Sequence, residues 1–141
     1  MNGRQAQPTE PSPLLQVQDL RTHFFTEDGV VEAVNGVDLE IRRGEVFGLV
    51  GESGCGKSVT GLSILRLVDK PGKIVGGDIL FNGRSLLELS EREMVRLRGD
   101  CISMIFQQPL SSINPVFSVG YQITETLRSH QHISRQDARE Q

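Results

Sequence analysis

Apolar and polar positions alternate over the first third of the chain, and this pattern predicts strands with one solvated face. Residues 14–25 alternate in part, as a half-buried strand does. Residues 27–29, Glu-Asp-Gly, predict a turn, so the chain from Val30 is expected to return as a hairpin partner. Residues 37–41 alternate cleanly and predict a further strand.

Two short apolar runs predict strands that are buried on both faces. One is residues 45–50, Glu-Val-Phe-Gly-Leu-Val, which stands directly before a glycine-rich loop. The other is residues 101–106, Cys-Ile-Ser-Met-Ile-Phe, whose first residue is expected to be a buried cysteine. Short continuous apolar runs of this kind are typical of strands inside a parallel sheet.

Glycine and proline divide the middle of the chain. The pairs Pro71-Gly72 and Gly76-Gly77 are expected to interrupt regular structure. Residues 78–81 then predict a strand, and the following Asn82-Gly83 predicts a turn.

Helical spacing of apolar residues appears in three segments. The first is residues 58–68, which follow the glycine-rich loop. The second is residues 90–98, in which Ser90 and Glu93 fit a capping box and basic residues occupy the last turn. The third is residues 119–127.

The last residues predict another helix start. Ser134 fits an N-cap, with Asp137 three positions later and no residue that would stop the helix. We therefore expect the chain to be the N-terminal portion of a longer protein. A genuine short protein with a frayed tail is the alternative.

Residues 51–58 read GESGCGKS and fit the P-loop pattern G-x-x-x-x-G-K-[ST]. Gly51, Gly54 and Gly56 allow a tight turn with N–H groups pointing inward, at the positive end of a helix. Lys57 can reach β- and γ-phosphates, and the Ser58 hydroxyl can bind Mg²⁺. The alternative is a chance match in a glycine-rich loop.

A dinucleotide site is excluded by the same residues. The pattern G-x-G-x-x-G requires a third glycine, and Val59 stands where it would be. The loop therefore predicts a nucleoside triphosphate, ATP, rather than a nicotinamide cofactor.

Composition narrows the class of protein. The 141 residues suit one small domain, 37% of them are hydrophobic, and the net charge of −3 argues against nucleic-acid binding. No run of about 18 apolar residues is present, and residues 1–13 lack the apolar stretch of a signal peptide, so a cytosolic protein is expected. Cys55 and Cys101 make neither a disulfide framework nor a zinc spacing.

Together these segments resemble the ATP-binding subunits of ABC transporters, and within them the dipeptide/oligopeptide importer type. The resemblance covers nearly all of residues 14–141. The stretches that carry it are LLQVQDLRTHF (14–24), AVNGVDLEIRRGE (33–45), GLVGESGCGKS (48–58) and MIFQQPLSSINPVFSVGYQI (104–123).

The resemblance implies a role for each matching residue. Residues 51–58 match the Walker A loop, so the implied nucleotide contacts are Gly51, Glu52, Ser53, Gly54, Cys55, Gly56, Lys57, Ser58 and Val59. Gln107 matches the Q-loop glutamine, which contacts Mg²⁺ or the attacking water; a polar residue that ends a strand is the alternative. Phe24 matches the aromatic residue that stacks on adenine, with Phe25 as its rival and a core position as the alternative for both.

The resemblance also implies a fold and a division of the chain. The expected fold is α/β, a three-layer P-loop NTPase core with an antiparallel β edge and an incomplete helical subdomain. Residues 1–13 are expected to be a disordered leader, residues 14–109 the first part of the ATP-binding core, and residues 110–141 the Q-loop region and start of the helical subdomain. Residues 111–121 resemble the region that docks on permease subunits, an exposed loop being the alternative.

Several family features are absent from these residues. Gln108 stands where an acidic residue is more common, no apolar run is followed by Asp-Glu, and no LSGGQ signature is present. His23, His130 and His132 do not match the family's switch histidine. Because the general-base carboxylate is missing, we expect the 141 residues alone to bind nucleotide weakly and not to hydrolyse it.

The family's mechanism predicts the partners. Two ATP-binding subunits, identical or different, enclose two ATP molecules and drive transmembrane permease subunits, with a solute-binding protein acting indirectly. The protein would lie on the cytoplasmic face of the cell membrane, and a peptide would be the solute. The alternatives are another P-loop protein, such as a nucleotide kinase, or a non-hydrolysing fragment that occupies a permease surface.

Overall fold

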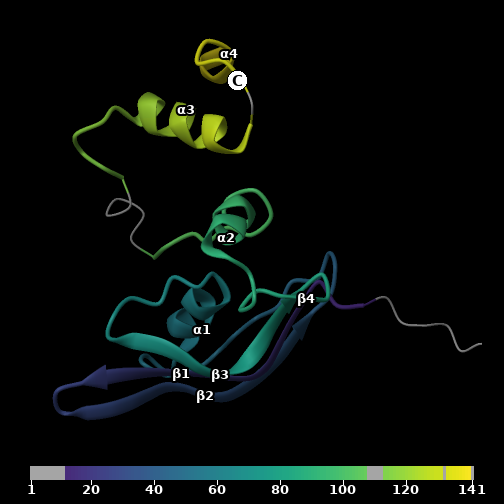
Figure 1. Ribbon diagram of the computed structural model, residues 1–141, viewed down its shortest axis with the longest axis vertical. Coiled ribbons are helices and arrows are strands. Elements are labelled where there is room, and N and C mark those ends of the chain that lie inside the picture. Colours follow the sequence, from purple (N-terminus) through teal and green to yellow (C-terminus); the bar gives the residue numbers. More distant parts are fainter. Residues whose placement is uncertain (1–11, 108–112, 132, 141) are drawn as a thin grey trace, which may run out of the picture. The chain divides into compact units, whose positions relative to one another are not determined.

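A computed structural model describes residues 12–107, 113–131 and 133–140 (Figure 1). Contacts within the chain form two compact units, Met1–Leu89 and Ser90–Gln141, and each is described by itself. Residues 1–11 of the predicted leader lie outside the described residues. The predicted boundary at residue 109 also falls in an undescribed stretch and stays a prediction.

The first unit is built on an antiparallel sheet with strand order β2-β1-β3-β4. Its elements are β1 (Leu15–Thr26), β2 (Gly29–Ile41), α1 (Lys57–Ile64), β3 (Gly72–Phe81) and β4 (Arg84–Ser85). The predicted hairpin is confirmed, since β1 and β2 pair from Thr26–Gly29 at the turn to Leu15–Ile41 at the far end. The two strand segments predicted between residues 30 and 41 form the single strand β2.

The sheet bends at a β-bulge in β1. The pairing register shifts between Val17 and Leu20, where Asp19 has a φ of 45°. Opposite the bulge, Gly77 has a φ of +83°, and a Cβ added there would lie 2.3 Å from the carbonyl oxygen of Asp19. Only glycine fits at this position, because any side chain would collide with the β1 backbone. Gly76 and Gly77 therefore lie inside β3 and do not interrupt it, contrary to the sequence prediction.

Helix α1 covers one face of this sheet (Figure 1). The buried apolar side chains of the unit, which form its core, are Val17, Leu20, Val34, Leu65, Ile79, Leu86 and Leu89. The helix ends at Ile64, before the predicted end at residue 68, because Arg66 turns into the left-handed region with a φ of 53°. The Arg66 guanidinium donates hydrogen bonds to the carbonyl oxygens of Leu86 and Leu89, at 3.1 and 2.6 Å.

The described part of the second unit contains three helices, each preceded by a serine cap. They are α2 (Glu91–Leu97), α3 (Val119–His130) and α4 (Asp137–Glu140). The capping box predicted at Ser90 is present in full. Ser118 caps α3 through the Tyr121 N–H, and Ser134 accepts from the Asp137 N–H at 3.2 Å, as the sequence predicted for the last helix. Side-chain oxygens thus satisfy N–H groups that a helix start leaves unpaired.

The two predicted buried strands are not formed, which corrects the sequence prediction. Residues 46–50 and 103–106 have no strand assignment, and Val46 and Ile105 are 98% and 92% exposed. Cys101 is likewise exposed. A buried strand needs neighbours on both sides for its N–H and C=O groups, and no strand in the described residues lies beside either segment. The predicted antiparallel strands and the predicted helices are formed, so the correction concerns these two strands alone.

Replacing Gly77 with alanine tests the close approach at the bulge. We expect Gly77→Ala to lower the free energy of unfolding by about 2–4 kcal/mol, because it adds a steric collision to the cost of a positive φ. Gly83→Ala is the matched control: Gly83 also has a positive φ, but nothing lies within 4 Å of an added Cβ, so about 1 kcal/mol is expected. Urea unfolding of both variants, made in the protein at its full natural length, measures the difference, and equal losses would contradict the steric argument.

The exposed segment at residues 46–50 generates a second prediction. A polypeptide limited to residues 1–141 should bind the dye anilinonaphthalene sulfonate strongly and scatter light, because contiguous exposed apolar surface promotes association. Replacing Val46 and Val50 with lysine should reduce both measurements. Val95→Lys, at a singly exposed position on α2, should change them little. A soluble monomer with a cooperative unfolding transition would oppose the prediction.

Candidate functional site

The loop of residues 51–56 leads directly into α1. Gly54 and Gly56 have φ values of +84° and +93°, and Gly56 is the N-cap, where no side chain caps the helix. No acidic residue occupies the first turn of α1. The N–H groups of this turn and the positive end of the helix are thus left for an anionic ligand.

The end of the loop is fixed by contact with β2. A Cβ added to Gly56 would lie 2.3 Å from the carbonyl oxygen of Ala33. Ala33 is the extra residue at another irregularity of the pairing, because β2 pairs Thr22 with Val34 but His23 with Glu32. No sequence pattern points to Ala33, since its contribution is a backbone carbonyl whose position depends on strand pairing.

The Lys57 side chain folds back across the loop. Its Nζ donates to the carbonyl oxygens of Gly51 and Glu52, at 2.8 and 2.7 Å, and lies 3.4 Å from Cys55 Sγ. An ammonium group has three donors, and here all three have partners in the loop. Phosphate oxygens could replace the neutral carbonyls, because hydrogen bonds between charged groups are the stronger ones.

Ser58 and the remaining loop residues fit a magnesium–nucleotide complex. Ser58 is exposed in the first turn of α1, and a hydroxyl oxygen is a ligand that Mg²⁺ accepts. Among the described residues, no group of three or more His, Cys, Asp or Glu side chains could hold a metal ion. A Mg²⁺ ion at Ser58 would take most of its remaining ligands from phosphate oxygens and water.

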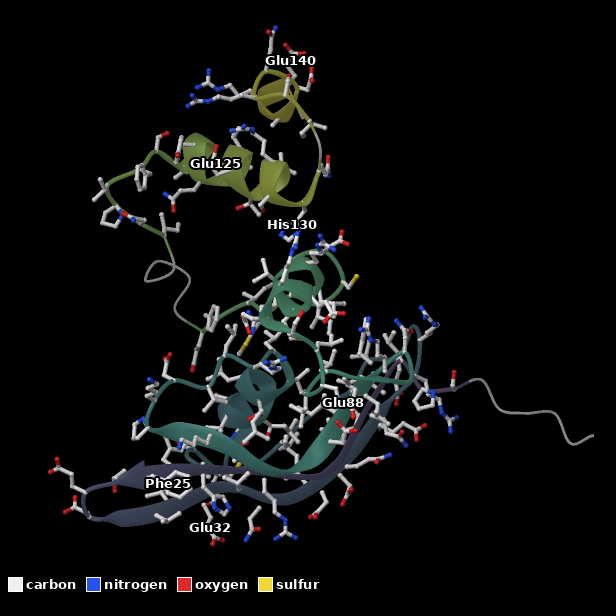
Figure 2. The ribbon with its side chains drawn as sticks, viewed as in Figure 1. Phe25, Glu32, Glu88, Glu125, His130 and Glu140 are labelled. Atoms are coloured by element: carbon white, nitrogen blue, oxygen red, sulfur yellow. The ribbon has the colours of Figure 1, made fainter. Side chains whose placement is uncertain are left out.

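Phe24 and Phe25 lie on opposite faces of the sheet. Thr22 reaches α1, and Phe24 shares its face because strand side chains alternate. The Phe24 ring lies over Gly72, where an added Cβ would be 2.7 Å from Phe24 Cε1. Phe25 is 46% exposed on the other face (Figure 2), with Lys73 Nζ 5.7 Å from its ring centre. Of the two candidates, only Phe24 lies on the face that carries α1.

Gln107 lies in the second unit and is exposed. Lys57 and Ser58 lie in the first unit, so the predicted place of Gln107 in the same site stays a prediction. Gln108 and His132 lie outside the described residues.

The cysteines and the two histidines that the structure describes form no further reactive cluster. Cys55 and Cys101 are both free thiols. Partial desolvation, together with the charge of Asp100 and a contact with its carboxylate, raises the pKa of the Cys101 thiol, which disfavours the reactive thiolate. His23 has a buried Nε2 without a partner, and His130 packs against Gly99.

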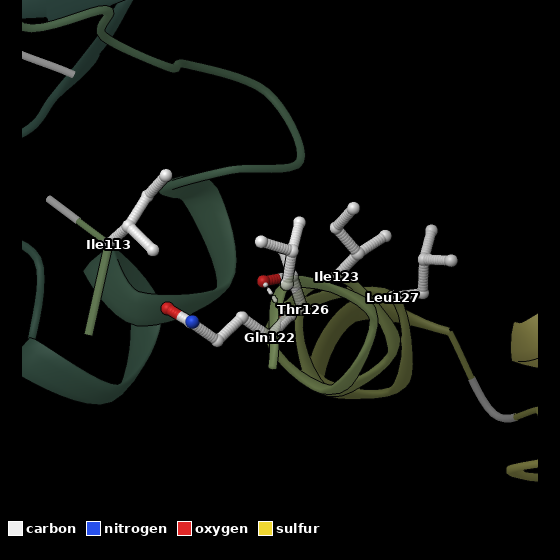
Figure 3. Close-up of a pocket in the computed structure, with 6 residues that line it drawn as sticks. Ile113, Gln122, Ile123, Thr126 and Leu127 are labelled. Carbon is white, nitrogen blue, oxygen red and sulfur yellow. Dashed lines mark hydrogen bonds between the residues drawn. The ribbon is translucent and has the colours of Figure 1, made fainter. Parts of the chain in front are cut away.

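An apolar pocket of about 410 Å³ lies along α3 in the second unit (Figure 3). Ile113, Val119, Ile123 and Leu127 line it together with Gln122 and Thr126. The Gln122 amide donates to the carbonyl oxygens of Asn114 and Phe117, both at 3.0 Å. None of these six residues carries a positive charge that could pair with a phosphate.

The helices that the structure describes were also compared with the length and hydropathy of a membrane span. None of them is long and apolar enough to cross a membrane.

Comparison with known proteins agrees with this geometry. The family model described as "ABC transporter" matches residues 34–140. A bacterial ABC transporter cassette, solved as a dimer, has the same fold with a TM-score of 0.77 at 22% identity; the match covers 89% of this chain and 53% of the cassette. A second structure of the cassette, with ADP and Pi bound, matches with a TM-score of 0.74.

Curated relatives are more similar in sequence. A probable peptide ABC transporter ATP-binding protein of Sinorhizobium fredii is 55% identical over 128 residues, covering 90% of this chain and 38% of that protein. An oligopeptide transport ATP-binding protein of Escherichia coli is 48% identical over 128 residues, covering 91% and 38%. The chain thus spans about 38% of the length of these relatives. With a family model matched over most of its residues and a cassette fold, the chain belongs to the ABC transporter family.

Proposed function

We propose that the protein carrying this chain is the ATP-binding subunit of an importer, in which ATP binding and hydrolysis drive a solute through permease subunits. The observation that carries the proposal is the glycine loop at the uncapped start of α1, with Lys57 lying across it. Membership of the ABC transporter family supports it. The names of several relatives, which include peptide and oligopeptide transport proteins, favour a peptide as the solute.

The loop residues would hold the phosphates of ATP. Backbone N–H groups of residues 51–59 would donate to phosphate oxygens, and Lys57 would exchange its carbonyl partners for the β- and γ-phosphates. Ser58 and Gln107 would bind Mg²⁺, which neutralises charge on the transferred phosphoryl group. Phe24, on the face that carries α1, would stack on adenine, since a flat ring is what base stacking needs.

We propose that residues 1–141 alone bind ATP without hydrolysing it. Phosphoryl transfer to water requires a group that orients the attacking water. These residues contain neither an apolar run followed by Asp-Glu nor an LSGGQ sequence. The exposed segments at 46–50 and 103–106 also favour a non-hydrolysing state for this part alone.

The proposed partners are a second ATP-binding subunit, the transmembrane permease subunits and, indirectly, a solute-binding protein. The dimeric state of the similar cassette supports pairing of two ATP-binding subunits. Such a subunit would work at the cytoplasmic face of the cell membrane as a peripheral protein. No partner is expected among nucleic acids, in keeping with a net charge of −3.

Removing the Lys57 ammonium tests the nucleotide site. We expect Lys57→Ala to weaken binding of Mg²⁺–ATP by about 10- to 100-fold, because charge-assisted hydrogen bonds to phosphate are lost. Lys73→Ala is the matched control: it removes a lysine over Phe25, on the sheet face opposite α1. Titration calorimetry measures both affinities. An unchanged affinity in Lys57→Ala would exclude the P-loop as the ATP site.

Whether Phe24 or Phe25 stacks on adenine is tested by comparing ATP with tripolyphosphate, which has no base. Phe24→Ala should weaken ATP binding by about tenfold through loss of stacking, and should leave binding of inorganic tripolyphosphate unchanged. Phe25→Ala, the control on the other face, should alter neither. If Phe25→Ala alone weakens ATP binding, the assignment of adenine to Phe24 is wrong.

A further inference from the structure

A buried pair of hydroxyl groups joins β1 to α1. Thr22 and Ser63 are both fully buried, and their oxygen atoms lie 2.8 Å apart although 41 positions separate them in the sequence. A buried polar group is costly unless it is hydrogen bonded. Valine at position 22 and alanine at position 63 would need no hydrogen-bond partner. Apolar packing alone therefore does not account for the two hydroxyl groups.

The direction of the hydrogen bonds follows from counting protons. Ser63 Oγ donates to the carbonyl oxygen of Val59, at 2.7 Å. A hydroxyl has a single proton, so Ser63 must accept, and Thr22 must donate, in the bond between them. The result is a directed chain from Thr22 to Ser63 and on to the Val59 carbonyl.

Both ends of this series of hydrogen bonds lie beside groups of the proposed nucleotide site. Phe24 follows Thr22 by two positions on the same face, and β1 pairs with β3 without a register shift from Thr22 to Phe24. Val59 lies in the first turn of α1, next to Lys57 and Ser58. The hydrogen-bond chain therefore links the strand that would hold the base to the helix turn that would hold the phosphates.

We propose that Thr22 and Ser63 are positioning residues that fix the separation between these two halves of the nucleotide site. The inference rests on the nucleotide binding proposed above. ATP joins an adenine base to a phosphate chain. Binding of one part raises the affinity for the other only if the protein holds the two contact sites at the matching separation. A freer α1 would keep the phosphate contacts and lose part of the gain from the base.

Phosphate binding by itself does not depend on this chain of hydrogen bonds. Lys57 holds the loop through Gly51 and Glu52, and Gly56 lies against Ala33 of β2. Loss of the Thr22 hydroxyl leaves all of these contacts in place. Loss of the hydrogen bonds is therefore expected to lower the affinity for ATP but not the affinity for a phosphate chain without a base.

The test compares Mg²⁺–ATP with Mg²⁺–tripolyphosphate on the purified protein at its full natural length. Thr22→Val and Ser63→Ala should each raise the dissociation constant for ATP by about 3- to 10-fold, as expected for loss of one hydrogen bond. The constant for tripolyphosphate should stay within about twofold. Thr22→Ser, which keeps the hydroxyl, should restore ATP binding.

A control variant separates positioning from general destabilisation. Ser85→Ala also removes a buried hydroxyl of the same unit. This hydroxyl donates to Asp78 Oδ1 at 2.6 Å, and Ser85 belongs to β4, at the opposite edge of the sheet from β2. It should lower the melting temperature and leave the ratio of the two affinities unchanged. A Ser85→Ala variant that changes this ratio as much as Thr22→Val does would overturn the inference.

The remaining outcomes are also decisive. The inference fails if Thr22→Val and Ser63→Ala raise the dissociation constants for ATP and tripolyphosphate by the same factor, or raise neither. It also fails if Thr22→Ser binds ATP as weakly as Thr22→Val does. It also fails, with the phosphate site intact, if the unmodified protein binds the two ligands equally. Binding of neither ligand by the unmodified protein would overturn the proposed function itself. Should Thr22→Val not fold, Ser63→Ala and Thr22→Ser decide the question.

Discussion

The close approach of Gly56 to the Ala33 carbonyl is the contact on which the candidate site depends. It places the last residue of the glycine loop against β2 and sets where α1 begins. Because Gly56 is the N-cap, the same contact determines where the unpaired N–H groups of the first turn lie. The positions of Lys57 and Ser58 follow from it, since both belong to that turn. A larger residue at position 56 would move the helix start away from the sheet.

Polar groups placed inside the first unit hold the rest of this arrangement. The hydroxyl chain from Thr22 through Ser63 joins α1 to β1, and the Arg66 guanidinium joins the end of α1 to the carbonyls of Leu86 and Leu89. Apolar packing between helix and sheet is non-directional, whereas these hydrogen bonds fix one register. The phosphate site proposed for the glycine loop would need that precision, because its donors must meet oxygen atoms at hydrogen-bond distance.

The unpaired segments at residues 46–50 and 103–106 show the limit of local pattern. Each has the composition of an interior strand, and neither forms one among the described residues. The antiparallel strands succeed because each has a neighbour connected to it within this chain, and β1 has one on both sides. Strand formation thus follows available partners more than residue type.

The sequence by itself determined the hairpin turn, two of the serine caps and the glycine loop before α1, because each depends on residues within a few positions of one another. Ser90 with Glu93, Ser134 with Asp137, and the glycines before Lys57 are local patterns with local physical causes. Tertiary structure alone decided that Phe24 rather than Phe25 shares the face of α1, that Ala33 supports Gly56, and that Thr22 donates to Ser63. These outcomes depend on strand register and bulges, which bring together groups more than 20 positions apart, and no short sequence pattern encodes such distances.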